Sequence, residues 1–90
     1  MHYVYIIQSQ KYKKLYIGYT ENLKTRFSEH NRGKVTATKN RRPLELIYFE
    51  AFRSKADAKS RERFLKSGFG RSQLKKALQH DLENLQYKYR

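Results

Sequence analysis

Two hydrophobic segments near the start of the chain predict a pair of β-strands. Residues 3–8, YVYIIQ, and residues 15–20, LYIGYT, are rich in the β-branched and aromatic side chains that are common in strands. The polar, basic segment 9–14 between them is short, so an antiparallel hairpin is expected. A third strand is predicted over residues 44–52, where apolar side chains fall on both faces, so both faces should be at least partly covered.

Hydrophobic residues spaced three or four apart predict a helix after the second strand. Thr20 or Asn22 can cap its start, and Gly33 stands where the helix should end, after about Arg32. One face of this helix, at positions i, i+3, i+4 and i+7, carries Leu23, Arg26, Phe27 and His30. That face should meet the sheet.

Two further helices are predicted after the third strand. Ser54 starts the first of them, with Asp57 three residues later in the register of a capping box, and this helix should end near Gly68. Residues 69–71, Phe-Gly-Arg, are expected to form a turn, after which Ser72 would cap the last helix. The hydrophobic stripe of the last helix would consist of Leu74, Leu78, Leu82 and Leu85.

The predicted order of elements, strand–strand–helix–strand–helix–helix, is typical of the α+β class. We therefore expect a small three-stranded antiparallel sheet flanked by helices. Ninety residues make a single domain, residues 1–90, with its core at about residues 3–79 and a C-terminal helix and basic tail over residues 80–90. The end of the chain, QYKYR, is expected to fray.

Positive charge is the strongest feature of the composition. Twenty-one Lys and Arg residues against eight Asp and Glu residues leave a net charge of +13 at pH 7. Such an excess repels itself in a compact fold, so a polyanion is the expected partner: DNA, with RNA as the alternative. Binding to a membrane surface is disfavoured, because it calls for a long amphipathic helix and no folded sheet. With no cysteine, no signal-peptide pattern and no long apolar stretch, a soluble protein of the cytoplasm is expected.

Two charged residues lie on helix faces that should be buried. Arg26, taken alone, is most simply an arginine whose stem covers apolar surface while its charged end reaches solvent. Glu62 shares a helix face with Ala58 and Leu65, although its other neighbours are mostly basic. Taken alone, Glu62 can form an i,i+4 ion pair with Lys66, or it can hold a divalent cation, since hard cations prefer oxygen ligands.

Five polar residues of these elements follow one another along the chain: Tyr5, Tyr16, Arg26, His30 and Glu62. Together they resemble the active-site residues of the GIY-YIG nuclease family. Residues 16–18, Tyr-Ile-Gly, match the second half of the family motif, and residues 3–5, Tyr-Val-Tyr, resemble the first half with Tyr3 in place of glycine. The resemblance covers residues 3–70 and is closest to the small stand-alone bacterial members, which are related to the N-terminal domain of the nucleotide-excision-repair nuclease subunit.

The resemblance implies hydrolysis of a phosphodiester bond with one Mg²⁺ or Mn²⁺ ion. Tyr16 would be the general base, for which an ordinary phenol needs nearby positive charge. Arg26 would bind the scissile phosphate, and Glu62 would hold the metal ion beside the leaving oxygen. Tyr5 would orient water or phosphate, and His30 would polarise Tyr16 or shuttle protons.

Two departures from the family pattern bear on the site. Tyr3 replaces the motif glycine, so the mouth of the cleft is expected to differ if that glycine allows a close backbone approach. Some family members carry a further asparagine or histidine near the site, for which Thr38 and Arg42 are candidate substitutes.

The expected nucleic-acid contacts come from the basic loop at residues 33–43 and from the helix that carries Glu62. They are Lys34, Lys39, Arg41, Arg42, Lys59, Arg63, Lys66 and Arg71. Such residues supply affinity without reading sequence, so non-specific or structure-dependent binding is expected, for instance to branched DNA in repair or recombination. A binding module with little or no catalysis and a structural protein of a ribonucleoprotein remain alternatives. Glu62 favours the nuclease, because a pure binder gains nothing from a carboxylate among cations.

Overall fold

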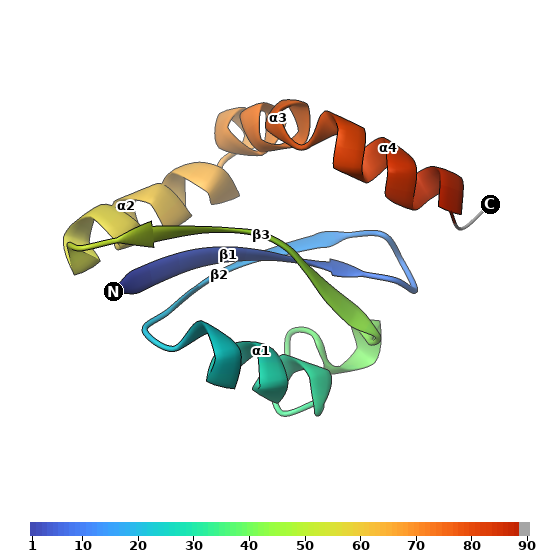
Figure 1. The fold of residues 1–90 in the computed structure, drawn as a ribbon, viewed down its shortest axis with the longest axis horizontal. Helices are drawn as coiled ribbons and strands as arrows, with labels where there is room; N and C mark the ends of the chain where they lie inside the picture. Colours follow the sequence, from blue (N-terminus) through green and yellow to red (C-terminus); the bar gives the residue numbers. More distant parts are fainter. Residues whose placement is uncertain (89–90) are drawn as a thin grey trace.

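A three-stranded sheet with helices on both faces forms the fold in a computed structural model, which describes the backbone of residues 1–88 and the side chains of residues 1–83. The elements are β1 (His2–Ser9), β2 (Leu15–Thr20), α1 (Leu23–Asn31), the 3₁₀ turn η1 (Lys39–Arg41), β3 (Leu44–Phe52), α2 (Lys55–Lys66), α3 (Gly68–Ala77) and α4 (Gln79–Lys88). Helix α1 covers one face of the sheet, and α2, α3 and α4 lie on the other (Figure 1). No helix within residues 1–88 has the length and hydrophobicity that crossing a membrane requires.

Strand β1 is the middle strand, and β2 and β3 pair with it on either side, both antiparallel. Tyr5 lies opposite Gly18 of β2 and opposite Phe49 of β3. The pairing of β1 with β3 shifts between Ile6 and Ile7, which marks a bulge in β3. The predicted α+β class, the three-stranded antiparallel sheet and the hairpin of the first two strands are confirmed.

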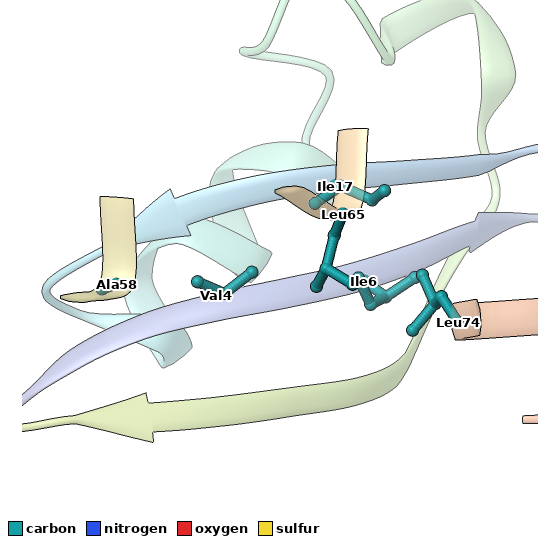
Figure 2. Packing of buried hydrophobic residues seen from close by; sticks show 6 residues of the cluster. All are labelled: Val4, Ile6, Ile17, Ala58, Leu65 and Leu74. Carbon is teal, nitrogen blue, oxygen red and sulfur yellow. The ribbon is translucent and has the colours of Figure 1, made fainter. Parts of the chain in front are cut away.

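The two faces of β1 belong to two different cores, because successive side chains of a strand point to opposite faces. The first core joins the sheet to α2 and α3, and its buried members, shown in Figure 2, are all aliphatic: Val4, Ile6, Ile17, Ala58, Leu65 and Leu74. Half-buried aromatic side chains, among them Tyr48 and Phe64, pack against them. On the other face, Tyr5 and Ile7 pack with Leu44 and with Leu23 and Phe27 of α1. The predicted inward face of the first helix is thereby confirmed.

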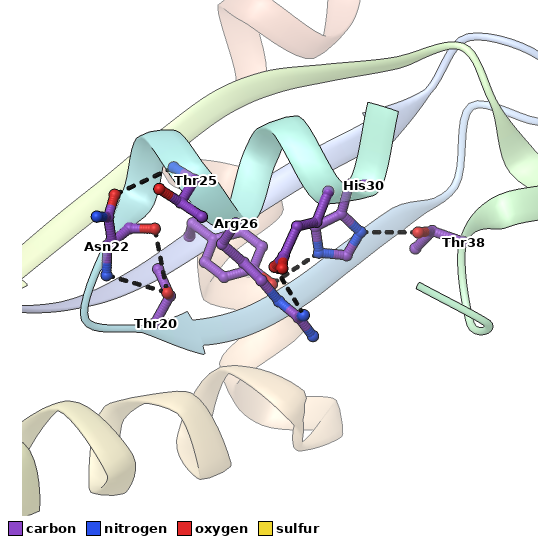
Figure 3. Close-up of polar contacts among 8 residues, drawn as sticks. Thr20, Asn22, Thr25, Arg26, His30 and Thr38 are labelled. Atoms are coloured by element: carbon purple, nitrogen blue, oxygen red, sulfur yellow. Dashed lines mark hydrogen bonds and ion pairs between the residues drawn. The ribbon is translucent and has the colours of Figure 1, made fainter. Parts of the chain in front are cut away.

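Side-chain oxygens cap the first two helices. Asn22 Oδ1 accepts a hydrogen bond from the Thr25 backbone N–H at 3.1 Å, so Asn22 rather than Thr20 is the N-cap of α1 (Figure 3). Ser54 Oγ accepts a hydrogen bond from the Asp57 backbone N–H at 3.2 Å, at the predicted start of α2. These caps fix where the two helices that carry the candidate site residues begin.

A charged contact fixes α2 on β3. Arg61 donates hydrogen bonds to both carboxylate oxygens of Glu50, at 2.9 and 3.0 Å, and the Tyr48 hydroxyl donates to the same carboxylate at 2.7 Å. Burial alone would raise the pKa of Glu50, but these hydrogen bonds outweigh it and hold the pKa below its ordinary value. Glu62 follows Arg61 in the chain, so the same contact positions the candidate metal ligand.

The turn predicted at residues 69–71 is wrong, because these residues lie within α3. Ser67 is the N-cap of α3: its hydroxyl accepts a hydrogen bond from the Gly70 backbone N–H at 3.1 Å. Gly70 is needed for close packing of α3 on α2, since a Cβ there would overlap the backbone carbonyl of Phe64. Ser72, the predicted N-cap, therefore lies inside the helix.

The predicted last helix is divided at Leu78, which separates α3 from α4. Leu74 is buried and Leu78 packs against the same core, as the predicted stripe requires, and Leu82 is half-buried. The side chain of Leu85 and residues 89–90 lie outside the described part of the chain, so the predictions made for them stay predictions.

Candidate active site

Four of the five residues of the predicted set lie on the α1 face of the sheet. Tyr5 comes from β1, Tyr16 from the edge strand β2, and Arg26 and His30 from the inner side of α1. The alternation of strand side chains brings the two tyrosines to the same face, and the helical period of four brings Arg26 and His30 together. Glu62 approaches from α2, on the other face (Figure 1).

A buried chain of hydrogen bonds joins three of the elements around this face. The Tyr5 hydroxyl lies 2.8 Å from Nε2 of His30, and Nδ1 of His30 lies 2.7 Å from Oγ1 of Thr38 (Figure 3). Tyr5 is 1% exposed, and His30 and Thr38 are fully buried. The chain therefore holds β1, α1 and the loop before η1 in one fixed arrangement, and satisfies buried polar groups that would otherwise be destabilising.

Arg26 places a positive charge beside the hydrogen-bonded side chains of Tyr5, His30 and Thr38. Its guanidinium lies next to the Tyr5 hydroxyl, and this contact raises the pKa of Arg26. Nη1 also forms an ion pair with Oε1 of Glu29 at 3.3 Å. The Arg26 side chain is 36% exposed, so the guanidinium is held from the protein side and still accessible to a ligand.

Burial raises the pKa of Tyr5 to about 12, against the opposing effect of the adjacent Arg26. The Tyr5 hydroxyl is therefore protonated at neutral pH. The hydroxyl keeps its hydrogen bond to Nε2 of His30, and the adjacent Arg26 guanidinium places a positive charge beside it.

His30 is a neutral ring within this chain. Burial, together with the charge of Arg26, lowers the pKa of His30 to about 4, although Glu29 opposes the shift. A neutral imidazole has one N–H donor and one acceptor nitrogen, so one ring nitrogen donates and the other accepts in the hydrogen bonds to Tyr5 and Thr38. His30 thus uses both ring nitrogens to fix Tyr5 and Thr38.

Gly18 of the Tyr-Ile-Gly segment makes room for Tyr5. The two residues face each other across β1 and β2. A Cβ at Gly18 would stand well inside van der Waals contact with the ring and hydroxyl of Tyr5. Only glycine at this position lets the Tyr5 ring lie across the edge strand and reach His30.

Tyr16 differs from Tyr5 in the freedom of its hydroxyl. Its half-buried ring packs edge-on against His30, with ring centroids 5.2 Å apart, and lies 6.4 Å from the ring of Tyr5. No hydrogen bond to the Tyr16 hydroxyl is found among the described side chains. That hydroxyl is therefore available to a water molecule or a substrate.

Glu62 lies between two lysines on α2. Its carboxylate forms ion pairs with Lys66 at 3.0 Å, as the i,i+4 spacing predicted, and with Lys59 at 3.5 Å. Burial is the main cause of the raised pKa of Tyr5 and of Tyr19, and the charge of Glu62 adds a smaller part to both. The carboxylate is thus within electrostatic range of tyrosines on both faces of the sheet, although no hydrogen bond within residues 1–83 joins it to the α1 face.

The surroundings of Glu62 fit a hydrated hard cation. Within the described residues, no group of three or more His, Asp or Glu side chains is placed to hold a metal ion. Mg²⁺ needs no such group, because it keeps several waters and often binds through one or two carboxylates and substrate phosphates. Lys59 and Lys66 are nearly half exposed, and exposed ion pairs contribute only about 0–1 kcal/mol, so both lysines can exchange Glu62 for phosphate.

The predicted nucleic-acid contacts are spread over more than one surface. Lys59 and Lys66 border Glu62, and the Lys59 ammonium also lies 4.5 Å from the ring centroid of Tyr19. Arg42 instead turns back and donates a hydrogen bond to a backbone carbonyl of η1 at 2.9 Å. The remaining predicted contacts are exposed or half-buried on the surface: Lys34, Lys39, Arg41, Arg63 and Arg71.

The hydrogen bond of Thr38 to His30 was not predicted from the sequence, and the consequence of Tyr3 was left open. Thr38, considered only as a substitute for a missing family residue, is the second hydrogen-bond partner of His30. It lies in an irregular loop, where no periodic pattern marks a buried residue. The Tyr3 ring packs edge-on against Phe49 of β3 with centroids 6.1 Å apart, so it turns toward β3.

Comparison with known proteins identifies the family of this fold. The GIY-YIG catalytic domain matches residues 1–76. A UPF0213 protein of Staphylococcus haemolyticus is 46% identical over 79 residues, which cover 87% of this chain and 94% of that protein. A UPF0213 protein of Clostridium perfringens is 45% identical over 67 residues, or 73% of this chain and 71% of that protein. One of Haloquadratum walsbyi is 42% identical over 67 residues, or 73% and 74%.

No solved structure matches the chain. A domain match over residues 1–76, together with relatives that share more than two fifths of their aligned residues, decides the identity without one. The chain belongs to the GIY-YIG family and has the fold of its nuclease domains.

Proposed function

We propose that the protein is an endonuclease that hydrolyses phosphodiester bonds of DNA with one Mg²⁺ or Mn²⁺ ion. Branched or flapped DNA in repair or recombination is its expected substrate. The observation that supports this most directly is the contrast between two neighbouring tyrosines: Tyr5 is fixed by His30, and Tyr16 has a free hydroxyl. A buried polar chain is costly unless fully satisfied, and it positions groups more sharply than an aliphatic core does.

Arg26 is the proposed ligand of the scissile phosphate. Its guanidinium is charged at any physiological pH and has the planar fork that binds two phosphate oxygens at once. The contact with Tyr5 fixes the Arg26 side chain. The ion pair of Arg26 with Glu29 is exposed enough for a phosphate to replace the Glu29 carboxylate. Arg26 would thereby stabilise the negative charge that grows on the phosphate oxygens in the transition state.

Tyr16 is the proposed general base for the attacking water. Tyr5 is unsuited to this role, because its pKa of about 12 keeps the proton on the hydroxyl. The Tyr16 hydroxyl has no hydrogen-bond partner among the described side chains, and its ring lies beside those of Tyr5 and His30, so its oxygen can accept a hydrogen bond from a water molecule. A water held by the Tyr16 oxygen would lose its proton as it attacks phosphorus.

Tyr5, His30 and Thr38 are proposed to position the reacting groups. The Tyr5 hydroxyl is hydrogen-bonded to His30 and lies next to the Arg26 guanidinium. His30 therefore acts through Tyr5 and Arg26 and needs no change of its own charge. This assignment gives His30 a positioning role in place of a proton shuttle.

Glu62 is the proposed ligand of the divalent ion. When bound, the ion would neutralise charge on the phosphate and assist departure of the leaving oxygen. Lys59 and Lys66 would turn from Glu62 to neighbouring phosphates, which conserves their electrostatic stabilisation. The exposed lysine and arginine side chains would supply affinity for DNA without sequence specificity.

A second candidate function, nucleic-acid binding with little or no catalysis, is favoured by one observation. Both oxygens of Glu62 are paired with lysines, an arrangement that also serves a purely structural ion-pair network. In that case Glu62 would only order Lys59 and Lys66 for contact with phosphates.

A cleavage assay on branched, flapped and single-stranded DNA with Mg²⁺ or Mn²⁺ separates the two candidates. Glu62→Gln should abolish cleavage, because the amide is a poor ligand for a hard cation. Asp57→Asn is the matched control: it removes the same charge from the same helix and should leave cleavage unchanged. Binding in EDTA should survive in both variants.

Three outcomes have different meanings. Loss of cleavage in Glu62→Gln alone supports the nuclease. DNA binding by the wild-type protein without any cleavage supports the binding module. Cleavage that persists in Glu62→Gln overturns the assignment of the metal ligand.

A further inference from the structure

A basic cavity lies against the face of β2 opposite to Tyr16. Its volume is about 510 Å³, and it is formed by the end of the β1–β2 hairpin, by η1 and by α3. The lining consists of Lys13, Lys14, Leu15, Ile17, Arg41, Arg71, Leu74 and Lys75. Five of these residues are cations and none is acidic, so the cavity concentrates one sign of charge.

Buried hydrogen bonds hold two walls of the basic cavity together. Ser9, 1% exposed, donates to the Arg41 carbonyl at 2.6 Å and accepts from the Tyr12 backbone N–H at 3.0 Å. The Gln10 backbone N–H donates to the Pro43 carbonyl at 2.8 Å. The hairpin and η1 therefore form one unit, and their cations stay close together despite mutual repulsion.

Helix α3 supplies the third wall. Arg71 and Lys75 are four residues apart, which places them on one side of the helix. Leu74, next to Lys75, is buried against Ile17, so the helix sits firmly on the sheet. Arg71 and Lys75 are exposed at the rim of the cavity, and the floor of the cavity is apolar.

Four of the five cations of the cavity differ from those near Glu62 in having no acidic partner among the described residues. Ion pairs among the described residues do not include Lys14, Arg41, Arg71 or Lys75. Low-dielectric walls of leucine and isoleucine strengthen the field of such a group, and its self-repulsion is relieved when an anion enters. An anionic group with several oxygen acceptors is the ligand that suits it.

We propose that the basic cavity binds a phosphate group of the nucleic-acid strand outside the bond to be cut. The identity of the strand rests on the proposed function, but the cavity itself does not. Leu15 and Ile17 of the lining flank Tyr16 on the same edge strand. A strand that passes this edge can therefore place one phosphate at Arg26 and another in the cavity, which would fix its path over the active site.

Two sources can supply this phosphate: an internal phosphodiester of the strand or a terminal phosphate monoester. Both offer the oxygen acceptors that lysine and arginine bind. The terminal group carries about −1.5 to −2 charges near pH 7, against one for a diester, so a terminal phosphate would gain more from the same cations.

The test is binding of a fluorescently labelled single-stranded oligonucleotide in EDTA, where no cleavage occurs. The variant Arg71→Ala/Lys75→Ala removes two cavity cations. The variant Lys55→Ala/Lys76→Ala is the matched control, with the same loss of charge from exposed helix positions outside the lining. All four side chains are exposed, so thermal unfolding of both variants should match the wild type.

Binding by the cavity variant should weaken about tenfold or more, and the dependence of log K on log salt should lose about one unit of slope. The control should weaken less than about threefold, because it loses only long-range attraction. Equal weakening of both variants would overturn the proposal and leave net charge as the cause.

The source of the phosphate follows from oligonucleotides with 5′-phosphate, 3′-phosphate or hydroxyl ends. A wild-type preference for one phosphorylated end that disappears in the cavity variant assigns the site to a terminal phosphate. Equal affinity for all three ends, with the cavity variant still weakened, assigns it to an internal phosphodiester. Because these measurements need no cleavage, they stand even if the protein proves to be a binding module.

Discussion

The two faces of the sheet are built on different principles. The face under α2 and α3 is closed by aliphatic side chains, with Ile6, Leu65 and Ala58 at 1% exposure or less. The face under α1 is equally dry at its centre, yet that centre contains a tyrosine, a histidine and a threonine joined by hydrogen bonds. On the first face the polar contact of Arg61 with Glu50 lies at the margin of an apolar centre, whereas on the second face the polar groups are at the centre itself.

This difference indicates that the α1 face of the sheet is the one suited to hold catalytic groups in place. An aliphatic core tolerates changes of shape that keep volume, but a buried hydrogen-bond chain fixes donors and acceptors in one arrangement. The α1 face ends at the edge strand β2, where Tyr16 and Arg26 reach the surface. The fixed side chains of Tyr5 and His30 therefore lie directly beneath the accessible side chains of Tyr16 and Arg26.

The largest expected effect comes from the aliphatic face. Leu65→Ala should lower the free energy of unfolding by about 2–5 kcal/mol, because it removes apolar contacts and leaves a cavity. Urea unfolding measures this loss. Thr38→Val on the other face should cost only about 1–3 kcal/mol, because it leaves the buried Nδ1 of His30 without its hydrogen-bond partner. A larger loss for Thr38→Val would contradict the division of roles between the faces.

The second effect is the dependence of stability on pH. The unfolded chain binds a proton at His30 near pH 6.5, whereas the folded protein does so only near pH 4. The unfolded state holds more protons in this window, so stability should fall by about 3 kcal/mol at most as the pH drops through it.

The control for this effect is His80, an exposed histidine in the C-terminal half of the sequence. His30→Gln should lose this part of the pH dependence of urea unfolding between pH 7 and 4.5, while carboxylate titration remains. His80→Gln changes an exposed residue and should behave as the wild type. Identical pH profiles for wild type and His30→Gln would show that His30 is not buried in its neutral form.

The third and smallest effect concerns the space over Gly18. Gly18→Ala should destabilise the fold by about 1–3 kcal/mol, because the added Cβ collides with Tyr5. It should also separate Tyr5 from His30, which ¹⁵N shifts of the imidazole report. Gly68→Ala is the control: a Cβ there meets nothing within 4 Å, and alanine should stabilise the helix by about 0.5–1 kcal/mol. Similar results for both variants would show that Tyr5 has room to move.

Local sequence patterns were sufficient for the strands and for the inner face of α1. β-Branched and aromatic side chains predicted β1 and β2, and the spacing of Leu23, Phe27 and His30 predicted a buried stripe, because each signal lies within its own element. The ion pair of Glu62 with Lys66 was predictable for the same reason.

Contacts between elements were not predictable in this way. Gly70 was interpreted as a turn residue, but it allows α3 to approach the backbone of α2, a demand that only the folded chain makes. His30 was expected to polarise Tyr16 or to shuttle protons, but its Nε2 lies 2.8 Å from the hydroxyl of Tyr5. The basic cavity also escaped notice, because its cations come from three separate segments.

The roles proposed for Tyr16 and Tyr5 are tested most directly by the pH dependence of single-turnover cleavage in wild type, Tyr16→Phe and Tyr5→Phe. The wild-type rate should rise with pH as the general base loses its proton, and Tyr16→Phe should be slowed by about 10²–10⁴-fold and lose this dependence. Tyr5→Phe should be slower but keep the wild-type slope, because Tyr5 only positions. A Tyr5→Phe variant that loses the pH dependence while Tyr16→Phe keeps it would contradict the assignment of the fixed and the free tyrosine.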